Sequence, residues 1–256
     1  MEKNSALHLF YKNLGETPYE AILRFKQDNP EYKDLPMTYA GRLDPMAEGF
    51  ILLLSGEKLT EKGKYLDLHK TYEFEILWGF ETDTLDLLGI VSSGEFLVSS
   101  VVPEEKEVQE YLEKSVGKFE QSYPAYSSKP VLGKPLFVWA RENRINEIEI
   151  PKHEVEVFES KYIERKEITG GELLEQIISK VSLVNGDFRQ EEIIKKWKDV
   201  LENKTEEKFI IDKLSLKVSS GFYIRQFASD MGKNFGTKAL AFSIKRTKVG
   251  EFYLGQ

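Results

Sequence analysis

Asp44 is the acidic residue whose surroundings best suit a chemical role. It lies in a loop, residues 39–49, with Gly41 and Gly49 on either side and Pro45 directly after it. Glycine permits backbone angles that other residues resist, and proline pushes the preceding residue towards an extended conformation. A stiff loop of this kind, directly before an apolar strand, can hold one carboxylate still for a reaction. The alternative is an ordinary turn in which the aspartate bonds its own backbone.

The amino-acid composition excludes several classes of protein. Of the 256 residues, 41% are hydrophobic and 31% are charged, which predicts a soluble protein of one large domain or two small ones. We expect no membrane span and no signal peptide. Cysteine is absent, which excludes thiol catalysis and disulfides and favours a cytoplasmic location. The three histidines lack ligand spacing, so no metal site is expected.

The charge is unevenly distributed along the chain. The formal net charge is −7, which by itself argues against binding to nucleic acid. Residues 209–256, however, carry eight Lys/Arg and three Asp/Glu, a local balance of 8 − 3 = +5. Residues 129–144 add four basic residues and one acid. This pattern predicts a basic face that could bind RNA, and the alternative is a set of solvated lysines.

Several elements can be predicted around the Asp44 loop. Residues 7–11 read as a strand. Thr17, followed by proline and then by Glu20, is typical of a helix start with a capping box, and the helix should end at Asn29. The apolar run 50–54 and the alternating run 70–76 predict two further strands.

The second half of the chain predicts helices as well as strands. Residues 103–116 form an amphipathic pattern, and residues 154–158 alternate as a strand. Two apolar helical stripes then lie within residues 164–208, with Trp197 in the second stripe, and an Asn-Gly-Asp turn separates them. We expect a helical hairpin there, with Trp197 in the core.

The Asp44 loop and four later stretches resemble one family in the same order. The loop is similar to the Gly-x-Leu-Asp-Pro-x-Ala-x-Gly signature of TruB pseudouridine synthases, in which the aspartate is catalytic. Residues 70–89 resemble the family's Lys-x-Tyr strand and its Gly-x-x-Thr-Asp-Thr-x-Asp-x-x-Gly continuation, and residues 121–129 resemble its Tyr-Ser-Ala-x-Lys segment. Residues 223–232 and 244–252 match Tyr-Ile-Arg-x-x-x-x-Asp-x-Gly and Leu-x-Arg-Thr-x-x-Gly-x-Phe.

Three positions depart from the family pattern. Asn13 stands where the family has a proline, Phe222 replaces a threonine, and Tyr39 replaces a histidine. The resemblance covers nearly all of the chain apart from residues 164–208. It implies an α+β pseudouridine synthase domain over residues 1–256, with a bent, mostly antiparallel mixed sheet flanked by helices. We expect residues 164–208 to be an inserted hairpin that is mainly structural, or that replaces part of the support of the family's C-terminal domain, and that does not reach the reactive uridine. We expect no C-terminal RNA-binding domain.

The implied reaction converts uridine 55 in the T-loop of tRNA to pseudouridine. The bond from C1′ to N1 breaks, the base turns, and C1′ joins C5, so no redox step occurs and no cofactor is expected. Asp44 could act as a nucleophile at the base or at C1′, or as a base that removes a sugar proton. Two alternatives remain: a synthase for another RNA, or a tRNA-folding chaperone that does not need chemistry.

The resemblance also assigns roles to other residues. Arg225 would pair with the Asp44 carboxylate. Tyr72 would stack on the flipped base and Ile244 would close the pocket. The predicted RNA contacts are Tyr39, Lys12, Lys129 and Arg246. The expected partner is the tRNA T-arm stem-loop, bound by a cytoplasmic monomer.

Overall fold

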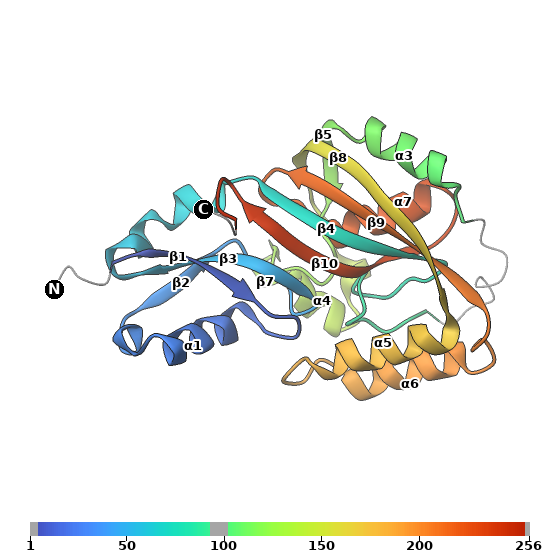
Figure 1. The fold of residues 1–256 in the computed structure, drawn as a ribbon, viewed down its shortest axis with the longest axis horizontal. Coiled ribbons are helices and arrows are strands. Elements are labelled where there is room, and N and C mark those ends of the chain that lie inside the picture. Colours follow the sequence, from blue (N-terminus) through green and yellow to red (C-terminus); the bar gives the residue numbers. More distant parts are fainter. Residues whose placement is uncertain (1–4, 93–101, 254–256) are drawn as a thin grey trace.

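The computed structural model describes residues 5–92 and 102–253. Its main sheet has the order β1-β3-β10-β4-β9-β8-β5, and β2 pairs with β3 beside this path (Figure 1). The β3–β10 pair is parallel, whereas the other pairs of this sheet are antiparallel. The predicted α+β fold with a mixed, mostly antiparallel sheet is therefore confirmed. The strands of the main sheet are β1 (Leu7–Lys12), β2 (Met37–Ala40), β3 (Ala47–Ser55), β4 (Lys70–Trp78), β5 (Gly117–Ser122), β8 (Lys152–Thr169), β9 (Lys208–Val218) and β10 (Ala239–Val249).

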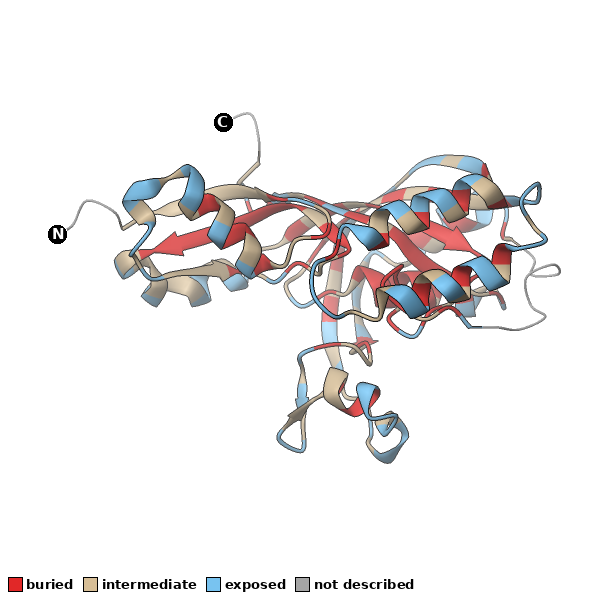
Figure 2. Cartoon of the chain, turned by 90° about the horizontal axis from the view of Figure 1, so that it is seen from below, coloured by how far each residue is buried: buried red, intermediate tan, exposed pale blue. Residues whose placement is uncertain are grey.

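Helices lie against the sheet and beyond its ends (Figure 1). The α-helices are α1 (Pro18–Asp28), α2 (Lys62–Leu66), α3 (Glu105–Lys114), α4 (Leu136–Arg141), α5 (Gly170–Ser182), α6 (Gln190–Leu201) and α7 (Ile224–Asn234). Short 3-10 turns occur at Pro30–Tyr32, Gly56–Glu61 and Ile145–Glu147. The small pair β6 (Pro130–Val131) and β7 (Lys134–Pro135) lies with α4 in a segment that projects from the body (Figure 2).

Helix α1 begins as its sequence predicts. The Thr17 hydroxyl oxygen accepts a bond from the Glu20 N–H at 3.2 Å, and the Glu20 carboxylate accepts one from the Thr17 N–H at 2.7 Å. This capping box satisfies two of the N–H groups that a helix start leaves unpaired. Ile22 and Phe25 are buried against β3, so the helix is fixed by its cap and by its apolar face.

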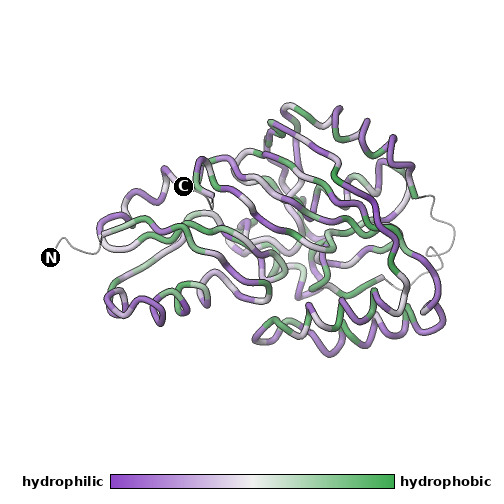
Figure 3. The backbone as a smooth tube through the Cα atoms, in the orientation of Figure 1, coloured by the Kyte–Doolittle hydropathy of each residue, from purple (hydrophilic) through white to green (hydrophobic). Residues whose placement is uncertain are grey.

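The core lies between the sheet and the helices that cover it. Buried residues run along the central strands (Figure 2), and β3 is one of the most hydrophobic segments, in contrast to the largely hydrophilic α3 (Figure 3). Helix α7 packs Phe227 and Met231 against Phe74 of β4. Full burial of one large apolar side chain contributes about 1.5 to 3 kcal/mol. Packing therefore fixes α7, which carries Arg225 in its first turn.

Helices α5 and α6 lie side by side and pack on the loop after β4. Trp197 is fully buried, as expected, and its ring lies 5.1 Å from that of Phe80. The helices occupy less of residues 164–208 than expected, because Glu164 to Thr169 continue β8 and pair with the start of β9. Strand β8 is mostly exposed or half-buried, so pairing with β9, rather than apolar alternation, extends it.

Candidate active site

The Asp44 loop joins β2 to β3 and depends on glycine at its end. Gly49 has a φ of +115°, and a Cβ atom there would lie 2.2 Å from the Arg246 carbonyl oxygen. Gly49 pairs with Arg246 across the parallel β3–β10 contact. Only glycine allows both this conformation and this close approach. The loop is thus held where the two strands meet.

Two predicted phosphate contacts, Arg246 and Lys12, instead bond backbone carbonyls inside the protein. The Arg246 guanidinium donates to the carbonyls of Phe50 at 2.6 Å, Arg42 at 3.3 Å and Gly41 at 3.2 Å. Lys12 donates to two carbonyls of the turn after β1. Arg246 is 1% exposed and Lys12 is 0% exposed. Both side chains are buried and donate to backbone carbonyls, so neither is open to a phosphate in this structure.

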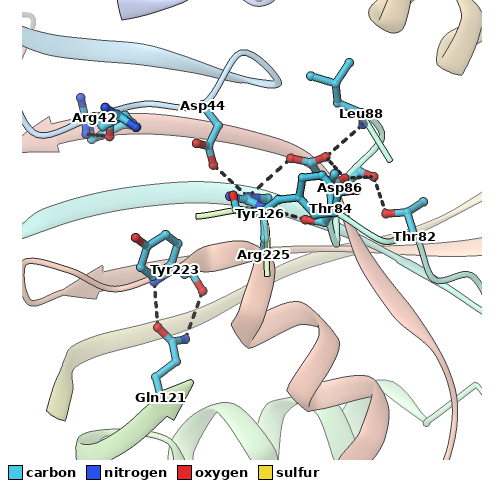
Figure 4. A network of polar contacts seen from close by, with 11 residues as sticks. Arg42, Asp44, Thr82, Thr84, Asp86, Leu88, Gln121, Tyr126, Tyr223 and Arg225 are labelled. Carbon is cyan, nitrogen blue, oxygen red and sulfur yellow. Dashed lines mark hydrogen bonds and ion pairs between the residues drawn. The ribbon is translucent and has the colours of Figure 1, made fainter. Parts of the chain in front are cut away.

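Asp44 and Arg225 are in direct contact. The Arg225 Nε donates to the Asp44 Oδ2 at 2.8 Å (Figure 4). The two residues are 181 positions apart in the sequence, and Arg225 is the second residue of α7. The arginine side chain is 5% exposed and the aspartate side chain is 34% exposed. The pair thus has a buried cation and a carboxylate that remains open to ligands.

The remaining contacts of Arg225 fix its plane. Its Nη1 donates to the Thr84 carbonyl at 2.5 Å and its Nη2 to the Tyr126 carbonyl at 3.4 Å. The Asp86 carboxylate lies 3.5 Å from its Nε. Burial acts to lower the pKa of Arg225, but Asp44 and Asp86 outweigh burial and raise it. The guanidinium therefore stays charged and keeps its orientation.

Asp86 is a site residue for which no role was predicted, although it belongs to the Thr-Asp-Thr-x-Asp run. The Thr84 hydroxyl donates to its Oδ1 at 2.6 Å, and the Leu88 N–H donates to the same oxygen at 3.0 Å. Burial raises the pKa of Asp86, while Arg225 opposes that shift. Asp44 and Asp86 flank the guanidinium (Figure 4), so Asp86 helps to hold Arg225 in place.

Tyr223 is a second site residue without a predicted role. Its N–H donates to the Gln121 Oε1 at 2.8 Å, and the Gln121 Nε2 donates to its carbonyl at 3.1 Å (Figure 4). Burial raises the pKa of its hydroxyl, and Asp44 adds to the shift. Its position directly before Ile224 and Arg225 in a matched motif was the available signal.

Asp44 borders two cavities. The smaller has a volume of about 240 Å³ and is lined by Tyr72, Ile244 and Tyr223 among others. The larger has a volume of about 430 Å³ and includes Tyr39 in its lining. The structure thus places Tyr72, Ile244 and Tyr39 beside Asp44. Lys129 lines neither cavity, and its Nζ lies 5.1 Å from the Tyr123 ring centroid.

The connection between α5 and α6 reaches this site, contrary to our expectation. Phe188 and Arg189 line the larger cavity together with Asp44. The Arg189 guanidinium forms two bonds with Asp83, at 2.7 and 3.2 Å. The helical stripes of the sequence indicate which faces pack, but they carry no information about where the connecting turn lies.

The predicted basic face is largely neutralised. Within residues 209–256, four lysines form ion pairs with carboxylates: Lys213, Lys217, Lys233 and Lys238. Two further cations of that segment, Arg225 and Arg246, are buried. The larger cavity instead gathers four arginines, Arg42, Arg141, Arg189 and Arg225, and two aspartates, Asp44 and Asp86. The balance of its charged lining residues is 4 − 2 = +2, opposite in sign to the whole chain.

Residues 5–92 and 102–253 hold neither a metal-binding cluster nor a membrane-spanning helix. No group of three or more His, Cys, Asp or Glu side chains suitable for a metal ion occurs in these ranges. None of their helices is long and apolar enough to cross a membrane.

Comparison with known proteins identifies the family. Residues 32–182 match the model of the TruB family pseudouridylate synthase N-terminal domain. The chain belongs to the TruB family. A TruB relative in Bordetella avium, tRNA pseudouridine synthase B, is 31% identical over 96% of this chain and 81% of its own length.

Other relatives are longer than this chain. The tRNA pseudouridine synthase B of Caldicellulosiruptor saccharolyticus is 28% identical to this chain. The match covers 84% of this chain but only 58% of that relative. A solved chain in the "Crystal Structure of a Cbf5-Nop10-Gar1 Complex" has a TM-score of 0.56 and 15% identity, over 97% of this chain and 50% of that one. This likeness supports the fold of the TruB domain.

Proposed function

We propose that this protein isomerises the T-loop uridine of tRNA to pseudouridine. The observation that carries the proposal is the contact between the open Asp44 carboxylate and the buried Arg225 guanidinium at 2.8 Å. Membership of the TruB family and a relative named tRNA pseudouridine synthase B agree with this activity. A protein that only bound RNA would not require this pair beside a cavity.

The smaller cavity is the proposed site for the detached uracil. Tyr72 offers an aromatic surface and Ile244 an apolar one, and both are nearly buried at 8% and 6% exposure. A base that leaves its stack is commonly held between aromatic or apolar side chains. Exclusion of water from this cavity would also protect C1′ while the base turns.

Asp44 is the proposed catalytic residue. The C1′–N1 bond breaks and the C1′–C5 bond forms, and the proton on C5 is released while N1 gains one. The carboxylate can act as a nucleophile at C1′ or at the base, or as a base towards a sugar proton. Each of these routes needs an ionised and oriented Asp44, and the Arg225 Nε donates to its Oδ2 at 2.8 Å and fixes its orientation. Asp86, Thr84 and Tyr126 position Arg225.

The larger cavity is the proposed entry for the RNA. Its charged lining residues have a balance of +2, which suits phosphates. Its aromatic residues, including Tyr39 and Phe137, suit unstacked bases. Action as a monomer in the cytoplasm belongs to the same proposal, in line with a sequence that has no cysteine.

The test uses an unmodified tRNA transcript and a second transcript with cytidine at the T-loop position. After incubation with the protein and no added cofactor, pseudouridine is mapped by mass spectrometry of nuclease fragments. We expect one pseudouridine in the T-loop fragment of the first transcript and none in the second. Pseudouridine at another position, or in both transcripts, would overturn the proposed target, and its absence would overturn the activity.

A further inference from the structure

The connection between α5 and α6, residues 183–189, is anchored to two other parts of the chain. A Cβ atom on Gly15 would lie 2.5 Å from the Leu183 carbonyl oxygen, so the connection packs tightly on the turn after β1. Asn185 donates to Glu20 of α1 at 3.2 Å, and Arg189 bonds Asp83 after β4. The connection therefore bridges two segments that border the larger cavity.

The connection is also ordered by its own contacts. The Gln190 side-chain amide donates to the carbonyls of Val184 at 2.9 Å and Gly186 at 2.8 Å, and its oxygen accepts from the Phe188 N–H at 2.9 Å. Arg189 has a φ of +65°, which is uncommon for a residue with a side chain. These contacts hold a conformation that a free loop would rarely adopt, so Arg189 is presented in a fixed place.

Arg189 retains donors for a ligand. A guanidinium has five N–H donors, and two of them bond Asp83. Asp83 also accepts from the Tyr126 hydroxyl at 3.0 Å, and Arg189 lies over the Tyr126 ring at 5.1 Å. The side chain is 31% exposed. Asp83 thus orients the arginine beside the cavity and uses only two of its five donors.

The other cations of the cavity come from distant segments. Arg42 belongs to the Asp44 loop and Arg141 ends α4, and both are exposed. The two carboxylates of the lining, Asp44 and Asp86, lie next to Arg225 instead. Three arginines from three separate segments therefore line this cavity, an arrangement suited to a phosphate backbone.

We propose that the α5–α6 connection is part of the RNA-binding surface, and that Arg189 binds a backbone phosphate next to the nucleotide that reaches Asp44. This inference rests on the proposed function. It gives the hairpin a role in positioning the RNA in addition to its packing role. Core packing accounts for Phe188 and the bonds to Asp83 anchor Arg189, so the inference rests on the donors of Arg189 that Asp83 does not use.

The experiment compares Arg189→Gln with Lys198→Gln. Each change removes one positive charge from the hairpin, but Lys198 is exposed on α6 and does not line the cavity. Glutamine at position 189 can still donate to Asp83, which favours folding, and thermal unfolding verifies it. Binding of a fluorescent T-arm stem-loop is measured at several salt concentrations, and kcat and KM are measured on the same RNA.

We expect Arg189→Gln to weaken binding and raise KM about tenfold, and to reduce the slope of log K against log salt by about 1. The kcat should change by less than about threefold, because Arg189 does not contact the reacting atoms. Arg189→Lys should recover part of the affinity and the full salt slope. Lys198→Gln should match the wild type in all three measurements.

Two outcomes would overturn the inference, and they are distinguishable. If the wild type binds and modifies the stem-loop but Arg189→Gln behaves as Lys198→Gln does, Arg189 is only a structural bridge and the proposed function stands. If the wild type binds no RNA, the proposed function fails and the inference fails with it.

Discussion

The Arg225 Nε lies 2.8 Å from the Asp44 Oδ2, and the two side chains differ sharply in exposure, at 5% and 34%. The cation is anchored inside by carbonyls of Thr84 and Tyr126, whereas the carboxylate borders two cavities. One partner therefore supplies charge and orientation, and the other remains free to react.

Replacing Arg225 should separate charge from geometry. We expect Arg225→Lys to lose at least about 100-fold in single-turnover rate, because an ammonium cannot reproduce the planar set of donors. It should also lower the free energy of unfolding by about 1 to 3 kcal/mol, since a buried carbonyl is left unpaired. Urea unfolding measures the second effect. Full activity in both Arg225→Lys and Arg225→Met would show that Asp44 does not need this partner.

Gly49→Ala tests the close contact of the loop with β10. The substitution places a Cβ 2.2 Å from the Arg246 carbonyl at a φ of +115°, so we expect a loss of about 1 to 3 kcal/mol in unfolding free energy and reduced activity. Gly63→Ala is the control, because Gly63 lies in α2 and a Cβ atom there would meet nothing within 4 Å. The control should be neutral or stabilising by up to about 1 kcal/mol. Equal stability of the two variants would contradict the loop geometry.

Arg141 and Arg144 form a matched pair for RNA binding. Arg141 lines the larger cavity, whereas Arg144 bonds Glu147 at 2.7 Å and lies outside the lining. Arg141→Ala should weaken T-arm binding by about 1 to 3 kcal/mol and reduce its salt slope by about 1. Arg144→Ala should change neither quantity measurably. Fluorescence anisotropy titrations at several salt concentrations provide both values, and a reversed order would place the RNA elsewhere.

Lys180 should make stability depend on pH. Burial lowers its pKa from 10.5 to about 8. Between these two values the unfolded chain binds the proton and the folded chain does not, so the wild type gains stability as pH rises. Lys180→Met lacks this gain, so its unfolding free energy relative to the wild type should fall from pH 8 to pH 10. Urea unfolding at both pH values measures this difference, and a difference that stays constant would contradict the lowered pKa of the half-buried Lys180.

Local signals in the sequence predicted several elements well. The start of α1 follows from Thr17, Pro18 and Glu20, because a capping box involves residues three positions apart. The contact between Asp44 and Arg225 spans 181 positions, and no local rule predicts it. Only the matched motifs around both residues indicated that they would meet.

Other features depend on segments that are distant in sequence. Arg246 was predicted to contact phosphate, but it is buried because the Asp44 loop folds over it. Strand β8 runs far beyond Phe158 because β9 pairs with it, although its sequence is rich in charge. Arg189 had no motif at all, and it lies in the cavity wall because the hairpin packs on the turn after β1.

Asp44→Asn tests the proposed catalytic role most directly, because it keeps the shape of the side chain and removes its charge. The yield of pseudouridine in the T-loop fragment is measured over time, with Asp34→Asn, an exposed aspartate outside both cavities, as the control. We predict no detectable product for Asp44→Asn with RNA binding largely intact, and wild-type product for Asp34→Asn. Turnover by Asp44→Asn within about tenfold of the wild type, or about 1.4 kcal/mol in barrier, would contradict the catalytic role of this carboxylate.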